Sequence, residues 1–167
     1  MAEPVVGILL FPGVDEADAL DPWGVLSYWA AHGAVRSAPR VVAFTRDGAP
    51  VECAGGLRVA VDHAASEAPD LAALVHPGGI GAYPLSTDRA HLAWLRRQRE
   101  RTAILAGVRS GALVLAAAGA LRERRATTHW GSLGALARLD GTVAVVADAD
   151  DDLDRCDVEE LRPLGLR

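Results

Sequence analysis

The sequence predicts an α/β fold, a three-layer sandwich in which a mainly parallel sheet lies between two layers of helices. Short apolar runs of strand length alternate along the chain with longer stretches of helical spacing, and this alternation is typical of βαβ units. The composition agrees, because half of the 167 residues are apolar and only 5% are aromatic. A chain dominated by Ala, Val, Leu and Gly suits tightly packed helices on a sheet better than an aromatic-rich β-sandwich.

The N-terminal region predicts a buried central strand followed by a helix. Residues 5–10 form an apolar run that ends at a Pro-Gly turn, as expected of a strand covered on both faces. Helical spacing follows over residues 15–31, but Pro22 lies inside this window. Because proline is favoured in the first turn of a helix, we expect the helix to start at Pro22 with Asp21 as its N-cap.

The remaining elements continue the alternation. Further strands are expected over residues 40–45, 71–76, 102–107 and 143–146. Further helices are expected over residues 88–101, 112–118 and 132–137. A hairpin of residues 51–53 and 57–61, and an extended piece over residues 125–130, complete the predicted elements.

Length and charge predict one domain over residues 1–147, followed by an acidic tail over residues 148–167. The net charge of −5 argues against a phosphate-binding surface. The two densest basic stretches, residues 96–99 and 122–125, lie beside Glu residues and are interpreted as solvated helix ends. We therefore expect no nucleic-acid partner.

The two cysteines, Cys53 and Cys156, lie far apart and lack the spacing of metal ligands. A reduced, cytoplasmic protein without metal or cofactor is expected. The N-terminus has no basic region before its apolar run, and that run is only as long as a strand. Neither a signal peptide nor a membrane association is expected.

A sharp turn joins the strand over residues 102–107 to the small-residue helix over residues 112–118. Gly111 follows two residues after the centre of this turn, which is the arrangement of a nucleophile elbow. The central residue of such an elbow is Cys or Ser, but here it is Arg109. A guanidinium keeps its proton under ordinary conditions, so Arg109 cannot attack a carbon atom.

Ligands of parallel sheets bind at the carboxyl ends of the strands. That rule gathers the loop after Leu10, the Pro77-Gly78-Gly79 turn, the Arg109 elbow and the Thr127-Thr128-His129 segment at one edge of the sheet. These same segments carry a family resemblance. Its motifs are Phe11-Pro12-Gly13-Val14, Asp18, Pro22-Trp23-Gly24-Val25-Leu26, Pro77-Gly78-Gly79-x-Gly81, the run from Ser110 to Gly119, and Arg125-Ala126-Thr127-Thr128-His129-Trp130.

In this order and spacing, from about Val5 to Trp130, the chain resembles the ThiJ/PfpI superfamily. It is most similar to the branch of isonitrile (isocyanide) hydratases and class I glutamine amidotransferase-like domains. The resemblance implies a flavodoxin-like sheet and, commonly, a homodimer. Relatives continue with a further strand pair and a closing helix, whereas only residues 148–167 remain here, so a C-terminally shortened fold is expected.

The resemblance also implies roles for individual residues. It places the nucleophilic cysteine of the family at Arg109 and the proton-transferring acid at Asp18. The other implied site residues are Gly78 and Gly79, whose amides help to hold an oxyanion, Ser110, which supplies a hydroxyl, and His129.

From the residues themselves, two interpretations of Arg109 stay open. It is either a relic that pairs with Asp18 and fills the pocket, or a recruited anion receptor. If Asp18 lies against Arg109, its pKa should be lowered. His76 is a further candidate for acid/base work, and Trp23, like Tyr83, for the pocket mouth.

These residues favour a small-molecule enzyme that works by non-covalent acid/base catalysis. Arg109 and the Gly78 and Gly79 amides would bind an anionic or carbonyl group, and Asp18 or His129 would move protons. Hydration or dehydration, isomerisation and cyclisation all suit this set. The alternative is a non-catalytic ligand-binding pseudoenzyme, for which an Arg109–Asp18 ion pair is expected in the free protein. A DNA-binding regulator is the weakest interpretation, because the chain has no room for a helix-turn-helix domain.

Overall fold

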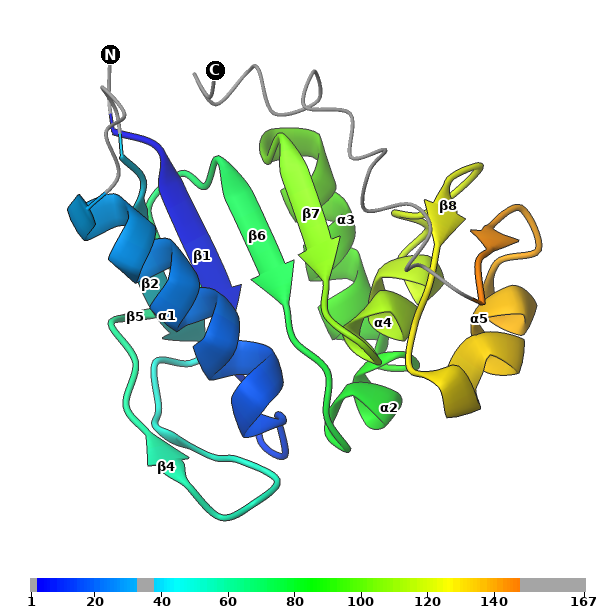
Figure 1. The fold of residues 1–167 in the computed structure, drawn as a ribbon, viewed down its shortest axis with the longest axis horizontal. Coiled ribbons are helices and arrows are strands. Elements are labelled where there is room, and N and C mark those ends of the chain that lie inside the picture. Colours follow the sequence, from blue (N-terminus) through cyan, green and yellow to red (C-terminus); the bar gives the residue numbers. More distant parts are fainter. Residues whose placement is uncertain (1–2, 33–37, 148–167) are drawn as a thin grey trace.

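The computed structural model describes residues 3–32 and 38–147 and has a five-stranded parallel sheet at its centre (Figure 1). The strand order is β5-β2-β1-β6-β7. These strands are β1 (Val5–Leu9), β2 (Arg40–Thr45), β5 (His63–Ala64), β6 (Ala73–His76) and β7 (Ile104–Gly107). The predicted α/β fold with a parallel sheet is thus confirmed. The expected acidic tail and Cys156 lie outside the described residues.

Helices cover both faces of the sheet (Figure 1). Helix α1 (Glu16–His32) crosses one face, and α3 (Arg89–Arg101) and α4 (Gly111–Ala117) lie behind the other. Within residues 3–32 and 38–147, the short helices α2 (Ala82–Leu85) and α5 (Leu133–Leu139) and one 3₁₀ turn (Trp130–Ser132) complete the helical elements. Among the residues described, no helix combines the length and apolar character that a bilayer crossing requires.

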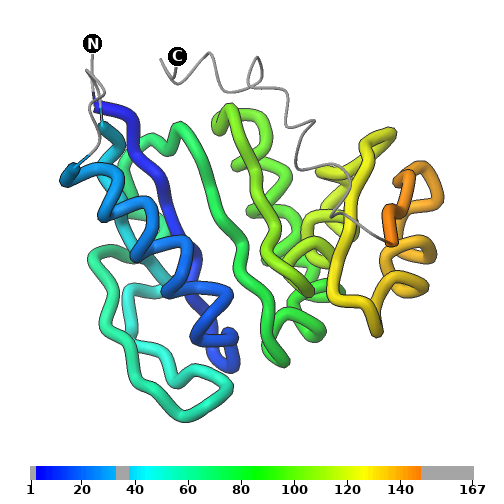
Figure 2. The backbone as a smooth tube through the Cα atoms, viewed as in Figure 1, coloured from blue at the N-terminus to red at the C-terminus, as the bar shows by residue number. Residues whose placement is uncertain are grey.

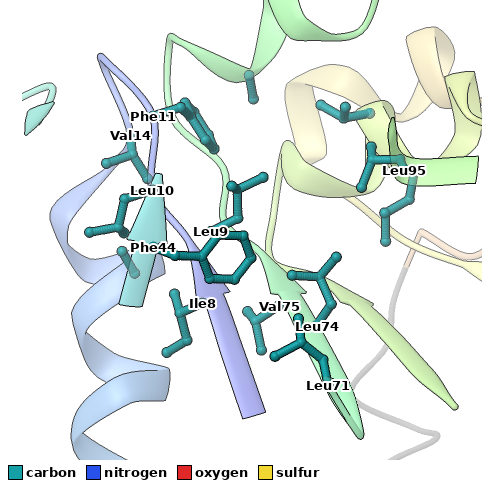
Figure 3. Packing of buried hydrophobic residues seen from close by; sticks show 14 of the residues in the cluster. Ile8, Leu9, Leu10, Phe11, Val14, Phe44, Leu71, Leu74, Val75 and Leu95 are labelled. Atoms are coloured by element: carbon teal, nitrogen blue, oxygen red, sulfur yellow. The ribbon is translucent and has the colours of Figure 1, made fainter. Parts of the chain in front are cut away.

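The core is built around β1, all five residues of which are buried. Ile8, Phe44, Leu74 and Leu95 belong to one cluster of buried side chains (Figure 3). Each such side chain contributes roughly 1.5–3 kcal/mol when it is fully removed from water. Gly7 makes this packing possible, because a Cβ atom at that position would lie 2.8 Å from the ring of Phe44.

The described part of the chain also forms two small sheets beside the central one. The hairpin expected over residues 51–61 forms as an antiparallel pair of β3 (Val51–Glu52) and β4 (Arg58–Val59). The last strand, β9 (Ala144–Val145), pairs in parallel with β8 (Arg125–Ala126) and does not join the central sheet.

The expected start of the first helix at Pro22 is wrong, because α1 already begins at Glu16. The N-cap is Asp15, whose Oδ1 accepts hydrogen bonds from the amides of Ala17 at 3.0 Å and Asp18 at 3.3 Å. This cap satisfies amides that otherwise lack partners in the first turn. Pro22 therefore sits inside the helix, where it forgoes one backbone hydrogen bond.

The carboxyl ends of β1, β6 and β7 lie along the same edge of the sheet. Figure 2 shows the loops that follow these three strands next to one another at the lower edge of the molecule. Backbone hydrogen bonds join them: the amide of Asp15 donates to the carbonyl of Gly78 at 3.0 Å, and that of Val108 to the carbonyl of His76 at 3.0 Å. The loops after β1, β6 and β7, which are far apart in the sequence, thus lie together at one edge of the sheet.

Candidate functional site

A pocket of about 300 Å³ opens at this edge of the sheet. Its lining residues come from the loop after β1, the turn after β6, the turn after β7 and the segment after β8. The carboxyl ends of parallel strands are where ligands are expected to bind. The residues that line it are Asp15, Asp18, Gly79, Ile80, Tyr83, Arg109, Ser110 and His129.

The strand-to-helix turn at Arg109 has the backbone of an elbow. Arg109 has a φ of +48°, in the left-handed region that residues other than glycine rarely occupy. Gly111 allows the turn to be sharp, because a Cβ atom there would collide with the carbonyl of His76. The hydroxyl of Thr128 donates to the carbonyl of Arg109 at 2.9 Å and holds the turn from outside. The elbow predicted from the sequence is confirmed.

The guanidinium of Arg109 lies between two carboxylates. One of its terminal nitrogens donates to Asp18 Oδ1 at 3.2 Å and lies 3.7 Å from Asp15 Oδ2. The side chain of Asp18 is only 4% exposed, whereas that of Arg109 is 51% exposed. Asp15 was missed from the sequence as a site residue. Its only signal was a position suited to helix capping, and it both caps α1 and faces Arg109.

The pKa of Asp18 is raised above its ordinary value, which corrects the expectation of a lowered one. Burial is the largest cause, because it penalises the charged carboxylate. The attraction and hydrogen bond of Arg109 oppose this effect without overcoming it, and the nearby charge of Asp15 adds to it. Asp18 is therefore a stronger base than a carboxylate whose pKa is lowered by a simple ion pair, and it keeps its proton to a higher pH.

The Pro77-Gly78-Gly79 turn uses its amides within the protein. The amide of Gly79 donates to Ser110 Oγ at 3.0 Å. The amide of Gly78 stabilises the charged form of Asp18 through a backbone hydrogen bond, which acts to lower the pKa of that carboxyl group. Gly79 has a φ of +117°, and a Cβ atom there would collide with the backbone of Asp15. A ligand oxyanion would therefore have to compete with Ser110 for the Gly79 amide.

His129 and Tyr83 both line the pocket. His129 Nδ1 accepts a hydrogen bond from the amide of Gly131 at 3.2 Å, so the ring proton of the neutral form lies on Nε2. The hydroxyl of Tyr83 is 3.1 Å from Ser132 Oγ, which fixes its ring at the pocket wall.

The structure does not bring His76 and Trp23 into this pocket. His76 is fully buried beneath the turn, where its Nδ1 donates to the carbonyl of Pro77 at 2.9 Å and its Nε2 lies 3.0 Å from Nε2 of His91. Burial lowers the pKa of His76 to about 3 and that of His91 to about 4. Trp23 lines a separate apolar pocket between α1 and the central sheet.

Cys53 does not line the pocket either. It is buried near the β3–β4 hairpin, and burial, followed by the charges of Glu16 and Asp15, raises the pKa of its thiol. This environment keeps the thiol protonated and poorly nucleophilic. Within residues 3–32 and 38–147, no three His, Cys, Asp or Glu side chains are grouped as metal ligands.

The parallel sheet, the elbow after β7 and the pocket at the strand ends together define a DJ-1-like, flavodoxin-type α/β protein. The chain belongs to the DJ-1/PfpI family, whose model matches residues 5–151. It is 35% identical to an isonitrile hydratase of Pseudomonas putida over 127 residues, which are 75% of this chain and 52% of that protein. It is 38% identical over 134 residues to an uncharacterized protein of Streptomyces lividans, covering 80% of this chain and 92% of that one.

Solved structures show the same fold. A ThiJ/PfpI family protein from Pseudomonas syringae matches with a TM-score of 0.73 and 25% identity, over 89% of this chain and 57% of that one. DJ-1beta of Drosophila melanogaster matches with a TM-score of 0.70 and 19% identity, over 88% of this chain and 75% of that one. The chain thus spans about half the length of the isonitrile hydratase and 57% of the first of these structures.

Proposed function

We propose that this protein is a small-molecule enzyme in which Asp18 transfers protons and Arg109 binds an anionic or carbonyl group of the substrate. The observation that carries the proposal is the pair itself. A carboxylate only 4% exposed lies 3.2 Å from a guanidinium that is half open to the pocket. A general acid or base works best when its pKa approaches the working pH, and burial shifts the pKa of Asp18 in that direction.

Arg109 limits which reactions this site favours. A fixed positive charge stabilises negative charge that develops in a transition state, such as that of an enolate or an oxyanion. The same charge disfavours a cationic intermediate, such as the nitrilium ion that forms when an isonitrile is protonated at carbon. Arg109 therefore favours hydration or dehydration, isomerisation or cyclisation of a carbonyl compound over hydration of an isonitrile.

Arg109 also makes the pKa of Asp18 depend on whether a substrate is bound. In the free protein its guanidinium contacts both Asp15 and Asp18. A substrate carboxylate that draws Arg109 away removes the attraction that holds down the pKa of Asp18. Asp18 then becomes a stronger base at the moment when the substrate is bound. His129, with its Nε2–H at the pocket wall, is a second proton donor for the substrate.

The same ion pair supports a second candidate, a ligand-binding protein without turnover. Two carboxylates already neutralise Arg109, and the Gly79 amide already donates to Ser110. Because these groups already satisfy one another, the contacts suit a pocket that no longer catalyses a reaction but still binds a ligand. If the elbow once carried a cysteine, as the family resemblance implies, Arg109→Cys is expected to restore thiol reactivity or isonitrile hydration in an otherwise intact frame.

Pyruvate in D₂O tests the lead proposal, because it offers a carboxylate to Arg109 and exchangeable methyl protons to Asp18. We expect the protein to accelerate loss of the methyl proton signal, measured by NMR. Asp18→Asn and Arg109→Ala should each slow this exchange by about 100-fold or more. Arg101→Ala is the matched control, since Arg101 forms an exposed ion pair with Asp70 and does not line the pocket.

Two other outcomes separate the candidates. Binding of pyruvate without exchange, weakened by Arg109→Ala, favours the ligand-binding protein. Exchange that persists unchanged in Asp18→Asn and Arg109→Ala contradicts the lead proposal, because the pair would then have no part in the proton transfer.

A further inference from the structure

A second pocket lies where α3 meets the end of α4. It has a volume of about 490 Å³ and is lined by Arg96, Arg99, Glu100, Ala118, Gly119 and Arg122. In the sequence its arginines belong to two stretches that are more than twenty residues apart, and each stretch alone suggests a solvated helix end. Packing of α3 against α4 brings them to one place. The pocket shares no lining residue with the Arg109 pocket.

The end of α4 positions two of these arginines. The amide of Ala120 donates to the carbonyl of Leu115 at 2.9 Å and that of Gly119 to the carbonyl of Ala116 at 2.8 Å, with Gly119 at a φ of +75°. These bonds form a Schellman motif. The motif leaves the carbonyls of Ala118 and Gly119 free for hydrogen bonds from α3.

Arg96 Nε donates to the carbonyl of Ala118 at 3.3 Å, and a terminal nitrogen of Arg99 donates to that of Gly119 at 2.7 Å. Each contact orients a guanidinium and uses only part of its five N–H donors. The planar forks of both arginines are thus held in place while most of their donors remain available, which lowers the entropic cost of binding an anion.

The charges of this pocket are unbalanced. Among the described residues, Arg96, Arg99 and Arg122 have no carboxylate within 4.0 Å, whereas Arg46, Arg58 and Arg101 each have one and Arg109 has two. The lining therefore holds three arginines and a single carboxylate, that of Glu100, in a chain whose net charge is −5. Arg122 also attracts Asp140 at longer range, but the strongest partner of that carboxylate is Thr142.

We propose that this arginine pocket binds a phosphate-class anion, namely a pyrophosphate or a phosphate ester. Guanidinium forks match the oxygen geometry of phosphate and donate two parallel hydrogen bonds to it. The arginines are exposed, so a single negative charge would gain little against solvent screening. An anion with two or more charges matches the three arginines of the lining, and the pocket, with a volume of about 490 Å³, is large enough for a diphosphate. This site does not depend on the proposed function of the Arg109 pocket.

Titration of the full chain with inorganic pyrophosphate, by calorimetry at 20 mM and 200 mM NaCl, tests the proposal. We expect one equivalent to bind and its affinity to fall as salt rises. Arg122→Ala should weaken binding by about tenfold or more, and Arg96→Ala by a similar factor. Arg122 makes no hydrogen bond that supports the fold among the described residues, so Arg122→Ala should keep the wild-type circular dichroism spectrum.

Two controls make the result specific. Arg58→Ala removes an exposed arginine already paired with Glu52 and should leave the affinity unchanged. Arg109→Ala should also leave it unchanged. The proposal is overturned if pyrophosphate does not bind, if Arg58→Ala weakens binding as much as Arg122→Ala does, or if binding is lost in Arg109→Ala and kept in Arg122→Ala.

Discussion

The guanidinium of Arg109 and the carboxylate of Asp18 meet at 3.2 Å although 91 positions separate them in the chain. One residue comes from the elbow after β7 and the other from the first turn of α1. Their contact joins the two sides of the pocket and places a strong cation next to a nearly buried acid. Every feature of the proposed chemistry depends on the balance between this attraction and the burial of Asp18.

That balance predicts opposite shifts in two variants. Arg109→Ala removes an attraction and a hydrogen bond, so the pKa of Asp18 should rise further above its ordinary value. Asp15→Asn removes a neighbouring negative charge, so the pKa of Asp18 should fall. Carbon-13 NMR titration of the Asp18 carboxyl group measures both. Shifts in the same direction in the two variants would contradict the arrangement described above.

The backbone of the elbow gives a second prediction. Arg109→Ala and Arg109→Gly both lose the guanidinium, and they differ only in how well the new residue tolerates a φ of +48°. We expect the glycine variant to be more stable than the alanine variant by about 1 kcal/mol, because a left-handed conformation costs glycine little. Urea denaturation of both variants measures the difference. Equal stability would mean that the turn relaxes once the arginine is removed.

Glycine positions in the turn and in α1 form a third, matched test. Gly79→Ala places a Cβ atom against the backbone of Asp15 at a φ of +117° and should destabilise the fold by about 2 kcal/mol or more. Gly24→Ala lies inside α1 with no atom within 4 Å of the new Cβ and should stabilise it by up to about 1 kcal/mol. Thermal unfolding of the two variants should therefore shift in opposite directions.

The buried pair of His76 and His91 predicts a dependence of stability on pH. The pKa values in the folded protein are about 3 and about 4, below the ordinary value of 6.5. Below pH 6.5 the two histidines therefore bind protons in the unfolded chain but remain neutral in the folded protein until the pH approaches their lowered pKa values. The stability contribution of the neutral pair is complete above pH 6.5 and is lost as the pH falls toward the folded values. The loss is on the order of 3 kcal/mol for one histidine by about pH 4.

Chemical denaturation between pH 4 and pH 8 checks this prediction. His91→Gln should flatten the acid limb of the stability curve, since one of the two buried titrating groups is gone. His32→Gln alters an exposed histidine at the end of α1 and serves as the control. An acid limb that is identical in wild type and His91→Gln would show that other groups cause the loss of stability.

Local patterns predicted most of the elements correctly. Apolar runs of four to six residues became the strands β1, β2, β6 and β7, and the amphipathic stretch from residue 88 became α3 with Asp88 as its N-cap. The start of α1 could not be read in this way. Pro22 is a strong local signal for the start of a helix, but the cap by Asp15 and the tertiary pairing of Asp18 stabilise a helical turn on its N-terminal side.

The residues of the candidate site also fall into two groups, those that the sequence predicted and those that depend on tertiary packing. The strand-end rule and the family resemblance gathered Asp18, Arg109, Ser110 and His129, all of which line the pocket. Asp15 and the burial of Asp18 were not predictable, because both depend on how closely the turn after β6 packs on the first turn of α1. His76 shares the edge of the sheet with these residues, but its side chain lies in the core.

The sequence by itself determined the alternation of strands and helices, the elbow and the presence of an arginine at its centre, because these depend on neighbouring residues. Only the tertiary structure decided the sign of the pKa shift of Asp18 and the meeting of Arg96 and Arg99 with Arg122. Both are properties of charges whose energy depends on what surrounds them in space. Burial and distance are fixed only when distant segments pack together, so no local pattern carries them.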